Sequence, residues 1–190
     1  MDWAIVVAVV IVIASYAWYA TLISRRNKVR EALGLIDVQL LKRHDLIPNV
    51  LKLAEKFMSH ENELMTGLTE LRVKADAPYE KDDPQQVKGH LDAAGSLQGL
   101  FGRFFAVAEE YPNLRSSETI LTAQNTYAEV EGHIAAARRF YNSAVNDLNN
   151  AVEIFPGGLI AGLARVRAMP FFEVDDEAAR APVRVEDHLK

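Results

Sequence analysis

A run of twenty uncharged residues from Ala4 to Ile23 constrains the architecture of this chain more than any other feature. A helix rises about 1.5 Å per residue, so this run would extend about 30 Å, the thickness of the hydrocarbon core of a bilayer. The two small polar residues within it, Ser15 and Thr21, can hydrogen-bond back to carbonyl groups of their own helix. The sequence therefore predicts a single transmembrane anchor within residues 1–24.

Two other interpretations of this segment are weaker. A buried helix of a water-soluble protein is usually shorter and has a polar edge, whereas this run is apolar on all sides. A cleaved signal peptide would need a basic start, a shorter apolar run and a small-x-small cleavage site. The charge that precedes the run is Asp2, and only Ser15-Tyr16-Ala17 resembles a cleavage site. We therefore expect the segment to remain attached as an anchor.

Four cations follow the apolar run within six residues: Arg25, Arg26, Lys28 and Arg30. Basic residues beside a span stay on the cytoplasmic side and face anionic lipid, each contributing about 1 kcal/mol near the surface. We expect this basic cluster at the membrane interface, a short N-terminus outside and the rest of the chain in the cytoplasm. The absence of cysteine agrees with a reducing compartment.

Beyond the anchor, about 165 residues remain, which is one domain's worth of chain. Apolar residues recur at steps of three and four, the period of a helix face. The first such stretch continues from the anchor to about residue 44, a second starts near Asp45, a third covers 84–111, and a fourth starts at Ser116 or Ser117. A short final helix is expected over 159–167. Residues 174–190 are charged and predict a tail without fixed structure.

The fourth stretch has the most regular pattern of the chain, with steps that alternate between four and three. Its positions are Ile120, Gln124, Tyr127, Glu131, Ile134, Arg138, Tyr141, Val145, Leu148 and Val152. This coiled-coil rhythm is typical of long helices that pack at a shallow angle. Four long helices with short connections predict an all-α protein, an antiparallel up-and-down four-helix bundle over residues 25–173.

Three residues of this stripe, Gln124, Glu131 and Arg138, are polar where the packed seam should be apolar. A buried charge must be paired, and Glu131 and Arg138 lie two turns apart, too far for direct contact. Their partners are therefore expected on neighbouring helices, and the candidates are Asp37, Arg43, Asp45, His60 and Glu61. Such a buried polar layer either fixes the register of the helices or binds a ligand or ion.

Motifs for catalysis, metals and cofactors are missing from the sequence. The five histidines are scattered, and His60-Glu61 lacks the second histidine of a zinc-protease motif. No cysteine, Gly-x-Ser-x-Gly elbow or phosphate-binding glycine loop is present. The net charge of −5 and the lack of aromatic residues among the cations argue against nucleic-acid binding. We expect no catalytic, cofactor or metal site.

Short motifs along the chain occur in the order and spacing of one known family. They are Arg26-Asn27, Asp37–Leu40, Arg43–Asn49, His60-Glu61, Ala108–Pro112, Glu131 with Ile134–Asn142, Phe155-Pro156 and Phe171-Phe172-Glu173. From Tyr19 to Glu173 the chain thus resembles the LemA proteins. It departs from them at Ala32-Leu33-Gly34, where the family usually carries an aromatic residue, and in its longer charged tail.

This resemblance implies a bacterial inner-membrane protein with one span and a cytoplasmic helical bundle, and it implies no enzyme activity. Some members of the family belong to magnetosome membranes, which implies organising work at a membrane. We therefore expect a non-catalytic scaffold or adaptor that acts through protein partners or self-association. The alternative is a ligand-binding or catalytic bundle that uses the buried Glu131 and Arg138 layer.

Overall fold

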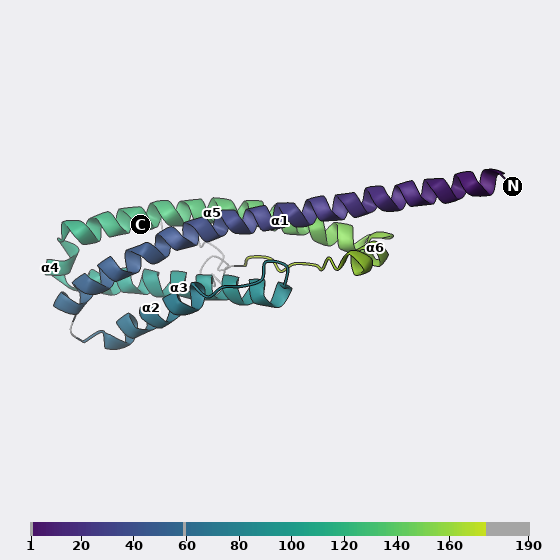
Figure 1. Ribbon diagram of the computed structural model, residues 1–190. Helices are drawn as coiled ribbons and strands as arrows, with labels where there is room; N and C mark the ends of the chain where they lie inside the picture. The colour runs from purple at the N-terminus through teal and green to yellow at the C-terminus, as the bar shows by residue number, and fades with distance from the viewer. Residues whose placement is uncertain (1, 59, 174–190) are drawn as a thin grey trace, which may run out of the picture.

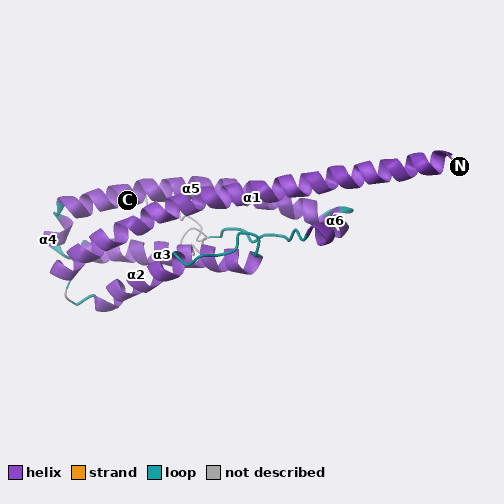
Figure 2. Cartoon of the chain, viewed as in Figure 1, coloured by secondary structure: helices purple, strands orange, loops and turns teal. Residues whose placement is uncertain are grey.

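The computed structural model describes residues 2–58 and 60–173, and the predicted tail over 174–190 lies outside these residues. The described chain is helical and contains no strand (Figures 1 and 2). Its helices are α1 (Asp2–Phe57), α2 (Asn62–Ala75), α3 (Pro84–Ala108), α4 (Pro112–Arg115), α5 (Glu118–Glu153) and α6 (Gly157–Ala164). The expectation of an all-α chain is confirmed over the described part.

Helix α1 is a continuous rod of 56 residues whose N-terminal part protrudes from the rest of the molecule (Figure 1). Side chains from Trp3 to Ala17 are exposed, and among the described helices only α1 is long and apolar enough to cross a membrane. This exposure fits a helix whose surroundings are lipid, because in water such a surface would be unfavourable. The structure is therefore compatible with a single-pass anchor at the N-terminus.

The prediction that a second helix starts near Asp45 is wrong, because α1 continues through Asp45 and Pro48 to Phe57. Both residues are exposed, so the proline ring faces away from the packed side of α1. The buried residues explain the continuity, because they keep the four-and-three rhythm without interruption. They are Val29, Leu33, Ile36, Leu40, Arg43, Ile47, Val50 and Ala54. Burial of this long stripe outweighs the missing amide hydrogen of one proline.

The helices lie in two antiparallel pairs, α1 beside α5 and α2 beside α3 (Figure 1). Helix α4 joins α3 to α5 at the end of the molecule farthest from the N-terminus, and α6 lies beside α1 and α5 at the opposite end. Short helix α4 was not expected from the sequence. The final helix, expected over 159–167, covers Gly157–Ala164.

The apolar core divides into two clusters along the long axis. One cluster, nearer the protruding helix, contains Leu22, Ile36 and Tyr141. The other contains Ile47, Phe101 and Phe104. The buried positions of α3 recur at steps of three and four, as the apolar pattern over 84–111 predicts: Val87, Leu91, Ala94, Leu97, Phe101, Phe104 and Ala108. On α1 the two clusters are separated by buried polar residues, Arg43 and His44.

The segment that follows α6 is extended and is held to α5 by two asparagines. Asn149 accepts from the amide of Met169 at 2.8 Å and donates to its carbonyl at 3.0 Å. Asn142 binds Phe172 in the same two-sided way, at 2.8 and 3.1 Å. Between them, the hydroxyl of Tyr141 donates to the carbonyl of Pro170 at 2.7 Å. These side chains satisfy backbone groups that lack a helix or sheet partner.

Candidate functional site

The polar layer between the two apolar clusters is built around Arg43, which is 1% exposed. Its Nη1 donates to Glu131 Oε1 on α5 at 3.1 Å, and its Nη2 donates to the carbonyl of Ala94 on α3 at 2.8 Å. One buried guanidinium therefore connects three helices. Because Glu131 remains partly accessible, the pair lies at the edge of the core rather than at its centre.

The remaining residues predicted for this layer do not gather around Arg43. Asp45 and His60 are exposed, because Asp45 lies on the outer face of α1 and His60 lies in the turn before α2. Glu61 and Gln124 are half-buried. Arg138 lies over the ring of Phe172, 5.9 Å from its centroid, and is thus placed near the C-terminal segment. The single layer expected from the sequence is reduced to the Arg43–Glu131 pair.

Asp37, also predicted for the layer, forms a separate cluster with the loop between α2 and α3. Its carboxylate accepts from the Tyr79 hydroxyl at 2.9 Å and from Lys81 Nζ at 2.6 Å. His90 Nε2 lies 3.2 Å from Asp37 Oδ1, and the His90 ring stacks on Tyr79 with centroids 4.1 Å apart. Burial raises the pKa of Asp37, but the contacts with His90, Lys81 and Tyr79 outweigh it and hold the pKa below its usual value.

His44 lies two helical turns farther along α1 than Asp37 and makes a short contact with Asp76 through Nδ1. Burial lowers the pKa of His44, and the carboxylate of Asp76 offsets this only in part. His44 and Asp37 line one cavity of about 370 Å³, together with Tyr79 and His90. Within the described chain, His44 Nε2 and His90 Nδ1 are buried without a hydrogen-bond partner. Both nitrogens are covered by surrounding atoms, so the two imidazoles line the cavity without exposing these polar atoms to it.

Sequence reasoning missed His44, Tyr79 and His90 as members of one cluster. Tyr79 belongs to a loop whose position depends on the packing of α2 against α3, and no periodic pattern encodes that position. The one available signal was the placement of His44 beside Arg43 on the buried face of α1. Among the described residues, no group of three or more His, Asp or Glu side chains is arranged to hold a metal ion.

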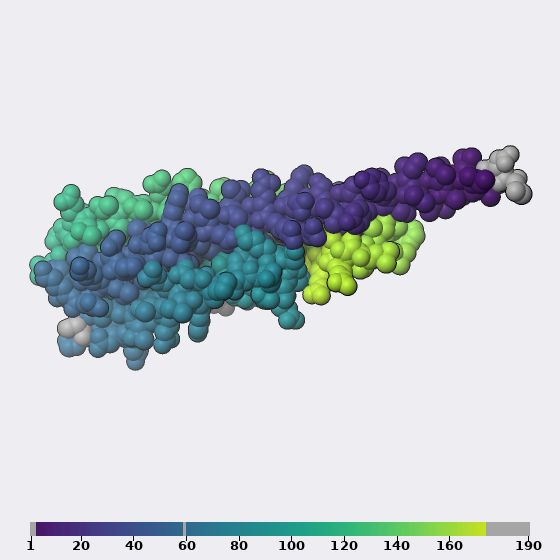
Figure 3. Space-filling view, in the orientation of Figure 1, coloured from purple at the N-terminus to yellow at the C-terminus, as the bar shows by residue number. Residues whose placement is uncertain are grey.

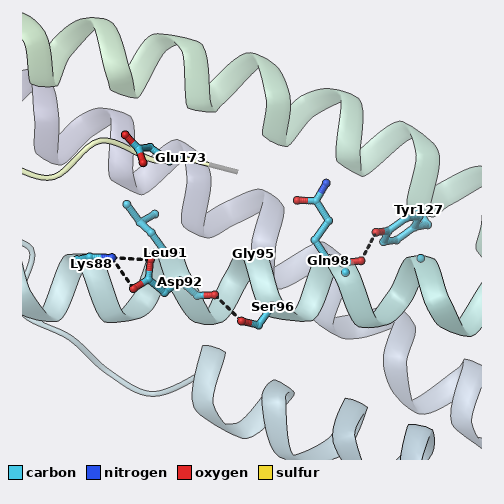
Figure 4. A pocket seen from close by; sticks show the side chains of 10 residues that line it. Lys88, Leu91, Asp92, Gly95, Ser96, Gln98, Tyr127 and Glu173 are labelled. Carbon is cyan, nitrogen blue, oxygen red and sulfur yellow. Dashed lines mark hydrogen bonds and ion pairs between the residues drawn. The ribbon is translucent and has the colours of Figure 1, made fainter. Parts of the chain in front are cut away.

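A second depression, of about 700 Å³, lies along α3 (Figure 4). Glycines line much of it, and a Cβ atom built at Gly95, Gly99 or Gly102 would meet nothing within 4 Å. Tyr127 borders the depression and donates to the carbonyl of Gln98 at 3.3 Å. Figure 4 shows polar side chains around its edge that point in different directions rather than toward one point. The polar side chains around this depression are therefore not arranged to act together on one bound molecule.

The four cations after the apolar run have different surroundings. Arg25 donates to the carbonyl of Asp147 at 2.6 Å, and Arg30 forms a two-point ion pair with Asp82. The hydrogen bond from Arg30 holds the pKa of Asp82 below its usual value. Lys28 is exposed, and Arg26 lines a narrow groove that also contains Arg165 and Arg167. Two of the four cations are therefore committed to contacts within the protein.

Comparison with known proteins gives the relatives of this chain. Residues 32–186 match the model of the LemA family. Protein LemA of Metamycoplasma hominis is 24% identical over 68% of this chain and 57% of its own length. Magnetosome protein MamQ 2 of Paramagnetospirillum magneticum is 29% identical over 45% of this chain, and MamQ of Magnetospirillum gryphiswaldense is 26% identical over 45%. The chain spans 32% and 31% of the length of these two magnetosome proteins. The chain belongs to the LemA family.

Proposed function

We propose that this protein is a non-catalytic scaffold or adaptor, anchored in the bacterial inner membrane by α1. In this proposal the two antiparallel helix pairs act as one four-helix bundle on the cytoplasmic side, with a short N-terminus outside. The observation that carries the proposal is the continuity of α1, which joins an exposed apolar stretch to the buried core in one helix of 56 residues. An uninterrupted helix holds whatever binds the bundle at a set distance from the bilayer.

The outer face of α1 supplies a docking surface for protein partners or for a second copy. Leu35, Val38 and Leu41 are 49%, 53% and 59% exposed and are spaced three residues apart. They lie on the side of α1 opposite the buried stripe, and we call them the α1 ridge. Exposed apolar residues grouped on one rigid element are typical of protein-binding surfaces. Two copies that share one membrane also have a raised local concentration, which favours their association.

The distribution of charge supports the proposed orientation. The basic cluster follows the apolar stretch directly, and Arg165 and Arg167 lie close to Arg26 in space. Cations concentrated at one end of a span are retained on the cytoplasmic side. Similarity to relatives named as magnetosome proteins supports a membrane-associated role for this chain.

Site-specific crosslinking in intact membranes tests the proposal. The chain has no cysteine, so Val38→Cys places one thiol on the α1 ridge of the full-length protein. We expect a thiol-reactive crosslinker to trap a partner or a second copy through position 38. Val73→Cys is the matched control, because Val73 is an equally apolar residue that is 68% exposed on α2.

The triple variant Leu35→Glu/Val38→Glu/Leu41→Glu should abolish binding of the partner captured through position 38 while the protein keeps its helix content. Strictly monomeric protein without a captured partner, or equal capture through positions 38 and 73, would contradict the proposal.

A ligand-binding or catalytic bundle is the second candidate, and the cavity beside His44 and His90 favours it. A substitution in the cavity separates the two roles. His90→Gln would abolish a chemical function with little change in melting temperature if the cavity binds a ligand. If melting temperature and function fall together, the residues that line the cavity are structural.

A further inference from the structure

The chain from Ile154 to Ala164 carries no charge, and its apolar side chains are unusually exposed. Phe155 is 82% exposed, Leu159 is 69% exposed and Leu163 is 88% exposed. Figure 3 shows this part of the chain beside the base of the protruding helix, on the outside of the molecule. Large apolar groups left uncovered on a short helix need an apolar partner.

The position of α6 along α1 identifies that partner. A Cβ atom built on Gly157 would lie 3.0 Å from Trp18 Nε1, so the start of α6 touches α1 at Trp18. Leu22 is fully buried in the same cluster as Ala161 and Val166. Helix α6 therefore packs against the last third of the apolar run, on the N-terminal side of Arg25, the first cation of the basic cluster.

This placement puts α6 at the level of the lipid. If the run from Ala4 to Ile23 fills the hydrocarbon core, Trp18 lies about 7 Å inside its cytoplasmic boundary, at 1.5 Å per residue. An interfacial helix buries its apolar face to a depth of about 5–10 Å. A helix that touches α1 at Trp18 and Leu22 cannot remain in water while those residues are within the bilayer.

The cations at the C-terminal end of α6 agree with this depth, whereas Glu153, directly before the uncharged run, is an exposed carboxylate. Arg165, in the left-handed conformation with φ of 53°, ends α6. It lines a narrow groove with Arg26, Arg30, Lys81 and Arg167, in which Asp82 is the acidic residue. Cations on the cytoplasmic side of an inserted apolar helix lie at the depth of the phosphate groups of an anionic leaflet.

We propose that α6 and the turn before it form a second membrane element, which inserts Phe155, Leu159 and Leu163 into the cytoplasmic leaflet beside α1. Arg26, Arg165 and Arg167 bind the anionic headgroups below it. The protein thus contacts lipid at two places, and the second contact fixes how the helical body is tilted and rotated on the membrane. This inference rests on the proposed anchoring by α1.

Labels at single cysteines in the otherwise cysteine-free chain test the insertion. Full-length protein with Leu163→Cys carries an environment-sensitive fluorophore and is reconstituted in vesicles of phosphatidylcholine and phosphatidylglycerol. Quenchers attached to acyl chains should reduce its emission, and aqueous iodide should not. Val12→Cys in the protruding helix and Val73→Cys on α2 are matched controls for lipid and water, because both residues are at least 66% exposed.

The outcomes separate this inference from the anchor on which it rests. Lipid quenching at position 12 with iodide quenching at position 163 retains the anchor and overturns the insertion. A label at 163 that neither quencher reaches indicates a protein partner on α6, and also overturns it. Iodide quenching at position 12 refutes the anchor itself.

The cations below α6 provide an independent readout. Arg165→Gln/Arg167→Gln should weaken lipid quenching at position 163 in vesicles rich in phosphatidylglycerol, whereas Arg103→Gln, an exposed cation on α3, should not. If lipid quenching at position 163 is the same with and without anionic lipid in the unaltered chain, the assigned role of the arginines is wrong.

Discussion

Arg43 on α1 and Glu131 on α5 form an ion pair with 3.1 Å between Nη1 and Oε1, at the boundary between the two apolar clusters. The two partners are not equivalent, because the side chain of Arg43 is 1% exposed and that of Glu131 is 17% exposed. A buried charge that loses its partner is destabilising, whereas a charge that reaches water can be hydrated. The pair therefore predicts an asymmetric response to substitution.

Glu131→Leu leaves the buried guanidinium without a counter-charge, and we expect it to lower the free energy of unfolding by about 3–5 kcal/mol. Arg43→Met leaves Glu131 at the edge of the core and should cost less, about 1–3 kcal/mol. The measurement is denaturant unfolding of the full-length protein in detergent, followed by circular dichroism. The double variant should recover part of the loss; strictly additive costs, or equal costs for the two single variants, would contradict the assignment.

Two glycines of α6 predict opposite effects for the same substitution. A Cβ atom at Gly157 would lie 1.9 Å from the carbonyl oxygen of Ala151, so Gly157→Ala should destabilise the protein by about 1–3 kcal/mol or more. A Cβ atom at Gly162 meets nothing within 4 Å, so Gly162→Ala should stabilise α6 by about 0.5–1 kcal/mol. Melting temperatures of the two variants check the prediction, which fails if both change in the same direction.

The two-sided hydrogen bonds of Asn142 and Asn149 predict a loss of order in the C-terminal segment when the side-chain donor is removed. Asp at either position keeps the acceptor but places a carboxylate against the carbonyl of Phe172 or Met169. We expect Asn142→Asp and Asn149→Asp each to cost about 1–3 kcal/mol. Trypsin should then cleave faster after Arg165 and Arg167.

Asn146 lies between these two residues on α5 and is exposed. Asn146→Asp should therefore leave both stability and cleavage unchanged. Equal acceleration of cleavage by all three substitutions would show that added negative charge, and not the lost hydrogen bonds, is responsible.

The buried His44 predicts that stability falls on mild acidification. Burial lowers its pKa in the folded protein below the ordinary value of 6.5, so between these two values the unfolded chain binds a proton that the folded chain does not. Stability is therefore fully present above pH 6.5 and decreases as the pH falls through this window. His44→Gln should remove this decrease, as measured by melting temperature across the window.

Asp37 responds at a lower pH. Its folded pKa lies below 3.8, so its contribution is present above this value and is lost only as the pH falls through the lower, folded pKa. A His44→Gln protein that still loses stability as the pH first falls below 6.5 would contradict the role of His44.

Periodic positions on single helices were predictable from the sequence, and the inward face of α3 is an example. The error at Asp45 arose because Asp45 resembles a helix N-cap and Pro48 resembles a proline in the first turn of a new helix. Leu40, Ile47 and Val50 nevertheless continue the buried stripe through this region. Arg43, the charged residue in this stripe, forms an ion pair with Glu131 and does not end the helix.

The amino-acid sequence alone determined the helical class, the apolar N-terminal run and the inward face of α3, because each depends on a local repeat of side chains along one helix. Only the tertiary structure decided that Glu131 pairs with Arg43, that Asp37 meets Tyr79 and His90, and that α6 lies against Trp18. These contacts join segments far apart in the chain. Their geometry depends on how helices and loops pack together, and no local period records it.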